Sequence, residues 1–310
     1  MKIVFLGTPK AAVPALEKIL QDGHEVVAVY TQPDRPSGRG NKISFSPVKE
    51  FAVQNNLQVF QPTKVKTADA FELFASHKAD VTVVVAYGRI LPLSFLEAFP
   101  KGAINVHFSL LPKYRGAAPV NWAIVNGEQK TGVTTMKMDV GLDTGDILLV
   151  SEIAIGNEEN AIELMDRLSL IGAELLSETL DKIDILTPQP QNHVEATFAP
   201  IMKKEDGAIN WNLTASEITN RVRGFQPFPT SYAKYQDKKI TIWKAREFQI
   251  SDFKFQIAGE ILEAKTDKLL ISCGKNSVLQ IEELQIEGKR RMTVRDFLNG
   301  IRLQIREKLD

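Results

Sequence analysis

Short apolar runs alternate with helical patterns along the first half of the chain, and this alternation limits the folds that it can adopt. Lys2–Leu6, Glu25–Thr31 and Val81–Ala86 are apolar enough to be strands buried on both faces of a sheet. Helical patterns lie between them, for example from Lys10 to Gln21 and from Ala68 to Ser76. Strands and helices at this spacing predict an open, mostly parallel, Rossmann-like α/β sheet.

Sheets of this kind bind ligands beyond the carboxyl ends of their strands. The first such end, Gly7-Thr8-Pro9, lacks the second and third glycines of the dinucleotide-binding motif. This argues against a nicotinamide-dependent dehydrogenase. The other candidate ends are Thr31–Pro33, Ala86–Arg89 and His107–Pro112.

The stretch Ile104–Gly116 carries the most suggestive side chains. Asn105 and His107 are two residues apart, so in a strand both leave the same face. The residues that follow, Ser109-Leu110-Leu111-Pro112, are too apolar for an ordinary solvated loop. An amide and an imidazole beside an apolar ledge suit an active site, but a buried strand with a packed turn fits the same residues.

Two loops have unusual compositions. The insertion Asp34–Pro47 contains three cations against one acid and is rich in Gly, Pro and Ser. It is either a surface loop or a clamp for a phosphate-bearing partner. Asp139–Leu148 holds three carboxylates and two glycines, which fit a hairpin turn, a weak cation site or a loop that exposes its backbone.

A mechanism follows if Asn105, His107 and Asp143 share one site. An amide and an imidazolium can both donate hydrogen bonds to the oxyanion of a tetrahedral intermediate. A carboxylate beside the imidazole favours its charged form and can move protons. Because no Ser or Cys nucleophile is needed, a bound amine could attack an acyl group directly.

The character of the chain changes after the amphipathic helix predicted at Ile162–Leu180. Thr187–Ala199 is rich in Pro, Gln and Asn and predicts a linker. Short β-type runs follow Gly207 and predict a small barrel. We therefore expect a catalytic domain at 1–188, a linker at 189–206 and a β-barrel domain at 207–310.

Charge and composition exclude several classes of protein. The chain has 38 Lys/Arg and 38 Asp/Glu, but residues 207–310 carry 18 and 13, so the C-terminal third is mildly basic. A single cysteine, Cys273, and four scattered histidines predict no disulfide and no metal site. No signal peptide is recognisable, and no apolar run approaches the roughly 20 residues that span a bilayer. We expect a soluble protein of the bacterial cytoplasm.

Two motifs resemble a known family. Asn-x-His-x-Ser-Leu-Leu-Pro at 105–112, followed by Leu-Asp-Thr-Gly-Asp at 142–146, resembles the 10-formyltetrahydrofolate-dependent formyltransferases. Further segments closely resemble the branch that acts on methionyl-tRNA: Thr31–Pro36, Gly38-Arg39-Gly40, Val84–Gly88 and Met138–Gly145. The resemblance covers essentially the whole chain and implies the formyltransferase fold with a C-terminal, OB-like barrel.

The resemblance also implies an activity. A formyl group would pass from 10-formyltetrahydrofolate, the co-substrate, to the α-amino group of methionine on initiator methionyl-tRNA, with no metal and no obligate protein partner. Asn105 and His107 would stabilise the oxyanion. Asp143 would orient and charge His107 and accept protons.

The resemblance assigns binding residues as well. The folate would contact Ser109, Leu110, Leu111, Pro112, Arg89, Ile90, Leu91, Asp139, Val140, Gly141 and Leu142. The Asp34–Pro47 loop would enter the acceptor stem through Arg39 and Lys42. Lys204 keeps its place as a tRNA contact, whereas Ile201 stands where the family commonly has a lysine. The C-terminal domain would hold the body of the tRNA through phosphate contacts.

Two alternatives stay open at this point. A formyltransferase for amino sugar nucleotides would share Ser109–Gly116 and a two-domain plan, although the Gly38–Gly40 insertion is not expected in it. A tRNA- or folate-binding protein without turnover is the other alternative, and the intact set of Asn105, His107 and Asp143 argues against it.

Overall fold

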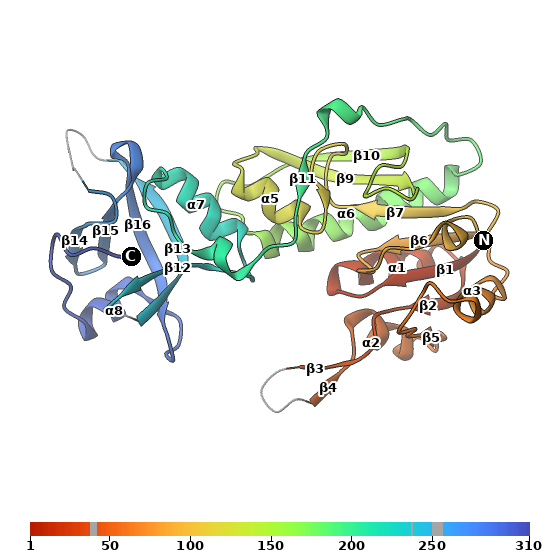
Figure 1. Cartoon of the computed structure of the whole chain (residues 1–310), viewed down its shortest axis with the longest axis horizontal. Helices are drawn as coiled ribbons and strands as arrows, with labels where there is room; N and C mark the ends of the chain where they lie inside the picture. Colours follow the sequence, from red (N-terminus) through yellow and green to blue (C-terminus); the bar gives the residue numbers. More distant parts are fainter. Residues whose placement is uncertain (38–41, 237, 250–256) are drawn as a thin grey trace. The chain divides into compact units, whose positions relative to one another are not determined.

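The computed structural model describes residues 1–37, 42–236, 238–249 and 257–310, and it divides into two compact units (Figure 1). The first unit comprises Met1–Pro119, Lys130–Ala154 and Met165–Ala199. The second comprises Val120–Gln129, Ile155–Leu164 and Pro200–Asp310.

A seven-stranded sheet in the order β10-β9-β7-β6-β1-β2-β5 forms the centre of the described part of the first unit (Figure 1). The five strands from β7 to β5 are parallel to their neighbours, and β9 and β10 are antiparallel additions at one edge. The predicted open, mostly parallel sheet is therefore confirmed. The strands are β1 (Lys2–Gly7), β2 (Glu25–Tyr30), β5 (Val59–Phe60), β6 (Val81–Val85), β7 (Ala103–His107), β9 (Lys130–Lys137) and β10 (Ile147–Ala154).

Helices cover both faces of this sheet, because its strands alternate apolar side chains between the two faces. They are α1 (Val13–Gln21), α2 (Pro47–Gln54), α3 (Ala68–Ala75), α4 (Leu93–Leu96) and α6 (Ala161–Lys182), with α5 (Pro119–Val125) beginning at the edge of the unit. On one face Leu6 of β1 shares a core with Phe74 of α3 and Phe95 of α4. On the other face α6 packs so closely that a side chain at Gly172 would meet Val106.

The packing of Val106 against α6 decides where its neighbours point. Side chains alternate along a strand, so Asn105 and His107 leave the opposite face of β7. The side chains of the adjacent strand β9 also alternate between the two faces of the sheet. Thr135 Oγ1 lies 2.8 Å from Thr179 Oγ1 of α6, while Thr134 Oγ1 donates to Ser109 O at 2.7 Å on the other face.

The carboxyl ends of three parallel strands are tied together. Thr8 Oγ1, after β1, donates to Tyr87 O at 3.1 Å, and Gln32 Nε2, after β2, donates to the same carbonyl at 3.0 Å. Arg89, after β6, donates through Nε to Gln32 Oε1 at 3.1 Å. This network fixes the edge of the sheet at which a ligand site is expected.

The predicted loop Asp34–Pro47 contains two short paired strands, β3 (Arg35–Ser37) and β4 (Lys42–Ser44). Its base is anchored, since Lys49 Nζ lies 2.5 Å from Asp34 Oδ2. This bond to Lys49 holds the pKa of Asp34 below its usual value. Arg39 and the side chain of Lys42 lie outside the described residues.

The second unit is built on an antiparallel sheet in the order β12-β13-β16-β15-β14, and β17 pairs with β16. The helix α7 (Ala215–Gly224) contributes Ile218 and Val222 to the core of this sheet, and α8 (Val294–Gly300) contributes Phe297. The strands are β12 (Ser231–Tyr235), β13 (Lys238–Phe248), β14 (Ile261–Lys265), β15 (Lys268–Ser272), β16 (Val278–Ile286) and β17 (Met292–Thr293). The predicted C-terminal β domain is confirmed, and its sheet is antiparallel.

The C-terminal segment bridges the two edges of this sheet. Lys234 of β12 exchanges two backbone hydrogen bonds with Asp310, at 2.6 and 3.0 Å. On the other side Leu309 N donates to Gly259 O at 3.0 Å and Ile261 N donates to Glu307 O at 2.8 Å. The segment therefore closes the sheet into a barrel, which leaves fewer unpaired edge groups.

The predicted linker is not free of structure. Gln189 pairs with Ile147 at the end of β10, and β11 (Phe198–Ala199) pairs in parallel with the short strand β8 (Arg115–Gly116). This stretch, residues 189–199, packs within the first unit and is called the connecting segment below. Within the described ranges, no helix is long and apolar enough to cross a membrane.

Candidate active site

Asn105 and His107 lie side by side on β7, and both are largely buried, with 8% and 6% of their surface exposed. The side chain of Asn105 has no hydrogen-bond partner among the described residues. Neither polar atom of this amide is among the fully buried atoms that lack a partner, so the amide faces accessible space. Asn105 is therefore placed to donate to a bound substrate.

The two ring nitrogens of His107 have different surroundings. Nε2 lies 3.0 Å from the carbonyl oxygen of Tyr114, and a carbonyl only accepts, so Nε2 carries a hydrogen. Nδ1 faces Asp143, with 3.7 Å between Nδ1 and Oδ2. Nδ1 is thus the ring nitrogen that is directed toward the carboxylate and that Tyr114 does not occupy.

Asp143 is held in place by backbone groups. Its Oδ2 accepts a hydrogen bond from Gly116 N at 2.8 Å, and its Oδ1 has no partner in the part of the chain that the structure describes. The backbone of Asp143 is left-handed, with φ of +52°. A residue other than glycine adopts this conformation at a cost of about 1–3 kcal/mol, so the surrounding loop must impose it.

The loop between β9 and β10 is closed by its own side chains. Asp139 Oδ1 accepts hydrogen bonds from Gly141 N at 3.0 Å and from Thr144 Oγ1 at 2.6 Å. A side chain at Gly145 would overlap Lys137 O, so only glycine fits there. The sequence predicted Asp139 as a folate contact, and the structure gives its carboxylate this role in shaping the loop.

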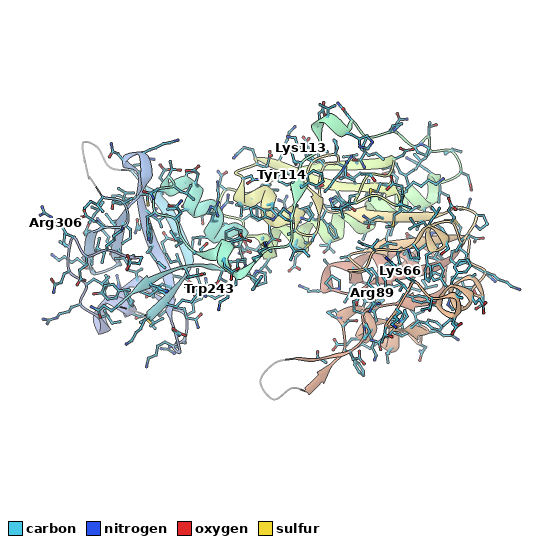
Figure 2. The ribbon with its side chains drawn as sticks, viewed as in Figure 1. Lys66, Arg89, Lys113, Tyr114, Trp243 and Arg306 are labelled. Atoms are coloured by element: carbon cyan, nitrogen blue, oxygen red, sulfur yellow. The ribbon has the colours of Figure 1, made fainter. Side chains whose placement is uncertain are left out.

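The apolar stretch after His107 forms a packed turn in front of the sheet. Ser109 is fully buried, and its hydroxyl donates to Lys113 O at 2.7 Å, which closes the turn. Leu111 N donates to Thr134 Oγ1 at 3.2 Å and so ties the turn to β9. Lys113 and Tyr114 mark the end of the turn in Figure 2. Folate contacts of this stretch stay a prediction.

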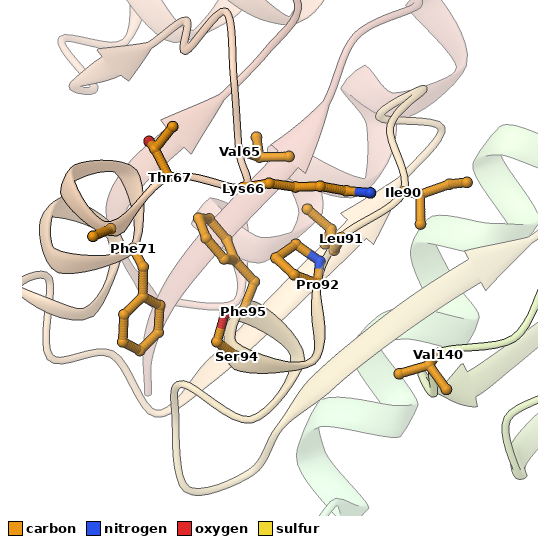
Figure 3. Close-up of a pocket in the computed structure, with 11 residues that line it drawn as sticks. Val65, Lys66, Thr67, Phe71, Ile90, Leu91, Pro92, Ser94, Phe95 and Val140 are labelled. Carbon is orange, nitrogen blue, oxygen red and sulfur yellow. The ribbon is translucent and has the colours of Figure 1, made fainter.

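A cavity of about 520 Å³ opens beside the loop that carries Asp143 (Figure 3). Three residues predicted to bind folate, Ile90, Leu91 and Val140, line it. Ile90 and Val140 are 75% and 69% exposed, and because both line the cavity they give it an accessible apolar surface. Arg89 does not line the cavity, because its guanidinium donates to Thr63 O at 2.6 Å and to Gln32.

The residues of the other wall of this cavity could not be predicted from the sequence. Figure 3 shows Lys66 extending toward Ile90, with Phe71 and Phe95 below it. The further lining residues are Val65, Thr67, Ala68, Pro92 and Ser94. They carry no motif, and the apolar pattern of α3 is that of any packed helix, so only the fold brings them to the site.

The predicted tRNA contact Lys204 lies in the second unit, at the start of a short 3-10 helix (Lys204–Gly207), and is exposed. It is close to Lys239, whose pKa is lowered by burial and by the charge of Lys204. Lys239 Nζ also lies 4.0 Å from the ring centroid of Tyr232. Two neighbouring cations next to an aromatic ring suit a phosphate-bearing partner.

Taken together, the site combines two hydrogen-bond donors with a carboxylate, one oxygen of which has no partner among the described residues. The apolar cavity lies beside the loop of this carboxylate, at Val140. The donors Asn105 Nδ2 and His107 Nδ1 suit a developing oxyanion, and Asp143 Oδ1 suits a transferred proton. Within the described ranges, no group of three or more His, Cys, Asp or Glu residues could hold a metal ion. This arrangement fits acyl transfer to a bound nucleophile.

Comparison with known families agrees with this chemistry. Residues 1–180 match the family described as formyl transferase, and residues 201–302 match the formyl transferase C-terminal domain. A methionyl-tRNA formyltransferase from Alkaliphilus oremlandii is 50% identical over 302 residues, or 97% of this chain and 96% of that protein. The methionyl-tRNA formyltransferase from Caldanaerobacter subterraneus subsp. tengcongensis is 50% identical over 303 residues, or 97% of each chain.

Solved structures share the fold. An N-formyltransferase from Helicobacter canadensis, in complex with folinic acid and dTDP-3-aminofucose, superimposes with a TM-score of 0.67 at 23% identity. The match covers 91% of this chain and 98% of that one. The structure of HypX from Aquifex aeolicus with tetrahydrofolic acid has a TM-score of 0.64 at 17% identity, covering 96% of this chain and 47% of that one.

Proposed function

The chain belongs to the formyl transferase family, and we propose that it transfers a formyl group from 10-formyltetrahydrofolate to the α-amino group of methionine on initiator methionyl-tRNA. The observation that carries the proposal is the pairing of His107 Nδ1 with Asp143 beside the unpartnered amide of Asn105. The identity of about one half to proteins named methionyl-tRNA formyltransferase supports the choice of acceptor.

The transfer needs no covalent enzyme intermediate. The amine of the acceptor attacks the formyl carbon, and the carbonyl oxygen becomes an oxyanion that accepts hydrogen bonds from Asn105 and from His107 Nδ1–H. Asp143 Oδ1 takes a proton from the attacking nitrogen. The bond between the formyl carbon and N10 of the folate then breaks, N10 receives a proton, and tetrahydrofolate leaves.

The donor's binding site is proposed at the cavity that Val140 lines, on the loop that also carries Asp143. Ile90, Leu91 and Val140 would contact the pterin end of the folate, and the turn Ser109–Pro112 would support the rest of the molecule. An apolar cavity with few polar groups suits a flat heterocycle. Holding donor and acceptor together supplies much of the rate in reactions of this type.

The tRNA is proposed to contact Arg39, Lys42 and Lys204. In this scheme residues 1–188 carry the chemistry, 189–206 connect, and 207–310 hold the tRNA. Arg39→Ala is expected to weaken the use of methionyl-tRNA and to leave folate binding unchanged, whereas Lys182→Ala on α6 should alter neither. Equal losses for tRNA and folate in Arg39→Ala would refute the proposed role.

A second acceptor class is favoured by one observation. The superimposable Helicobacter canadensis enzyme was crystallised with an amino sugar nucleotide. Incubating the protein with formyl-folate and either methionyl-tRNA or dTDP-3-aminofucose separates the two functions. We expect formylmethionyl-tRNA as the product, and formylation of the sugar nucleotide alone would reject the proposal.

The site of action is proposed to be the bacterial cytoplasm, where charged initiator tRNA is used. The named relatives from Alkaliphilus oremlandii and Caldanaerobacter subterraneus subsp. tengcongensis are bacterial, which supports this proposal.

A further inference from the structure

A glutamine of the connecting segment reaches into the site. Gln191 is buried, with 6% of its surface exposed. Its Nε2 donates to two carbonyl oxygens of the loop between β9 and β10, which is called the catalytic loop below. They are Asp143 O at 3.0 Å and Gly145 O at 2.7 Å. One side chain thus holds the backbone on both sides of Thr144, directly behind the Asp143 carboxylate.

The orientation of the Gln191 amide is fixed by chemistry. Its Oε1 accepts from Arg115 Nε at 3.1 Å and from Arg115 Nη2 at 2.6 Å. A guanidinium only donates and a carbonyl only accepts, so the amide cannot be turned over. Arg115 is 4% exposed, and its Nη2 also lies 3.0 Å from His193 Nδ1. The network is therefore buried and has a single arrangement.

This network acts where the loop is strained. Asp143 is left-handed, so its carbonyl would relax to another direction if nothing held it. Gln191 supplies the donor that holds this carbonyl. The carboxylate of the same residue is held by Gly116 N, which follows Arg115 in β8. The hydrogen bond from Gln191 to the Asp143 carbonyl and the hydrogen bond from Gly116 to the Asp143 carboxylate thus both depend on the contact between β8 and the connecting segment.

The same segment also fixes the partner of His107. Thr197 Oγ1 accepts from Tyr114 N at 2.9 Å, and Thr197 O accepts from Arg115 N at 2.9 Å. Tyr114 is the residue whose carbonyl orients His107 Nε2. The geometry of the pair His107 and Asp143 is therefore controlled by residues 191–197, which lie outside both sequence motifs.

We propose that Gln191 is a positioning residue, which sets the Asp143 carboxylate opposite His107 Nδ1 through the backbone of the catalytic loop. The inference rests on the formyl transfer proposed above. Gln191 affects the rate of the chemical step and not the binding of either substrate. A misplacement of about 1 Å in such a site can cost on the order of 100-fold in rate.

A purely structural role would give a different pattern. In that case Gln191 would serve only as the partner that a buried arginine requires. Gln191→Glu separates the two roles, because its carboxylate still accepts from Arg115 but cannot donate to Asp143 O and Gly145 O. Gln189 offers a matched control, since it is an exposed glutamine two residues earlier. Among the described residues its side chain donates only to Thr187 O.

The test measures formyl transfer to methionyl-tRNA for Gln191→Glu and Gln189→Glu. We expect kcat to fall about 10- to 100-fold in Gln191→Glu with both KM values within about twofold, and Gln189→Glu to match the unmodified protein. In an Asp143→Asn background Gln191→Glu should cause no further loss, because it acts through Asp143. Normal kcat, or a loss that adds fully to that of Asp143→Asn, would overturn the inference.

A second readout does not depend on activity. The Gly116 amide donates to Asp143 Oδ2, so its hydrogen exchange reports the position of the carboxylate. We expect Gly116 to exchange faster in Gln191→Glu than in Gln189→Glu, with α6 amides unchanged. Equal protection of Gly116 in the two variants would refute the positioning role even if the acceptor proved to be another molecule, whereas failure of the unmodified protein to formylate methionyl-tRNA would refute only the proposed function.

Discussion

At the scale of single residues, the most informative feature is that the two ring nitrogens of His107 have different partners. Tyr114 O fixes the hydrogen on Nε2, and Nδ1 is left to face Asp143. The sequence predicted His107 but not the different partners of its two nitrogens. The partner of Nε2 is a backbone carbonyl, and any residue type at position 114 supplies one. The same reasoning explains why Gln191 was missed, since its partners on the loop are also carbonyls.

The first prediction concerns His107. His107→Ala removes one donor to the oxyanion and the partner of Asp143, so kcat is expected to fall by about 100- to 10,000-fold. Thermal unfolding should stay cooperative, since the ring lies at the end of β7 and not in a helix–sheet core. Single-turnover formylation with saturating donor measures the effect, and a variant within threefold of the unmodified rate would contradict it.

The second prediction concerns Asn105. Its amide has no partner in the described residues, so Asn105→Ala should cost little stability while lowering kcat by about 100- to 1,000-fold. The combination distinguishes a catalytic donor from a packing residue. Urea unfolding and steady-state rates of the same preparation provide the test, and a large loss of stability with an unchanged rate would reverse the assignment.

At the scale of elements, the helices and strands of the first unit could be predicted from the sequence. The spacing of its apolar residues and the positions of its turn residues indicate the same elements. For example, the helix predicted at Ala68–Ser76 is α3, and the strand predicted at Val81–Ala86 is β6. In the second unit some strands are longer than the short β-type runs that the sequence indicates. For example, β13 continues to Phe248 through Lys244, Arg246 and Glu247, whose charged side chains concealed a strand that is buried on one face only.

The third prediction concerns the start of α7. Thr214 Oγ1 accepts from Glu217 N at 3.2 Å, and Glu217 Oε2 accepts from Thr214 N at 2.7 Å, which is a capping box. Thr214→Ala is expected to lower the free energy of unfolding of the second unit by about 1 kcal/mol. Ser216→Ala, at an exposed position in the first turn, is the control. Equal stability of the two variants in urea would show that the cap contributes nothing.

The fourth prediction concerns pH. Tyr30 Oη lies 2.8 Å from His77 Nε2, and burial lowers the pKa of His77 below its ordinary value of 6.5. The unfolded chain therefore binds this proton more readily than the folded chain. The stabilisation from His77 is complete above pH 6.5 and is lost as the pH falls below it.

His77→Gln tests whether His77 makes the free energy of unfolding fall as the pH falls, because the glutamine still accepts from Tyr30 but does not titrate. The free energy of unfolding, measured between pH 7 and pH 5, should fall less steeply in this variant than in the unmodified protein. A steeper fall in His77→Gln would mean that the imidazole is stabilised in its charged form.

At the scale of the whole molecule, each unit has its own core. The sequence predicts the domain bounds 1–188, 189–206 and 207–310, and these stay a prediction. What it could not supply was the closure of the second sheet by residues 306–310, because those hydrogen bonds join backbone groups. Leu309 is 2% exposed and belongs to the core of that unit. Leu309→Ala is expected to cost about 2–5 kcal/mol. An unchanged urea midpoint would show that the closure does not contribute to stability.

The proposed function of the whole molecule depends on the pair His107 and Asp143, and Asp143→Asn tests this account most directly. The amide keeps the shape of the side chain and can still accept from Gly116 N, but it can neither take a proton nor pair with an imidazolium. In rapid-quench single turnovers with 10-formyltetrahydrofolate and initiator methionyl-tRNA, we expect the rate of formylmethionyl-tRNA formation to fall by at least about 100-fold, with tRNA binding unchanged. A rate in Asp143→Asn equal to that of the unmodified protein would contradict the account.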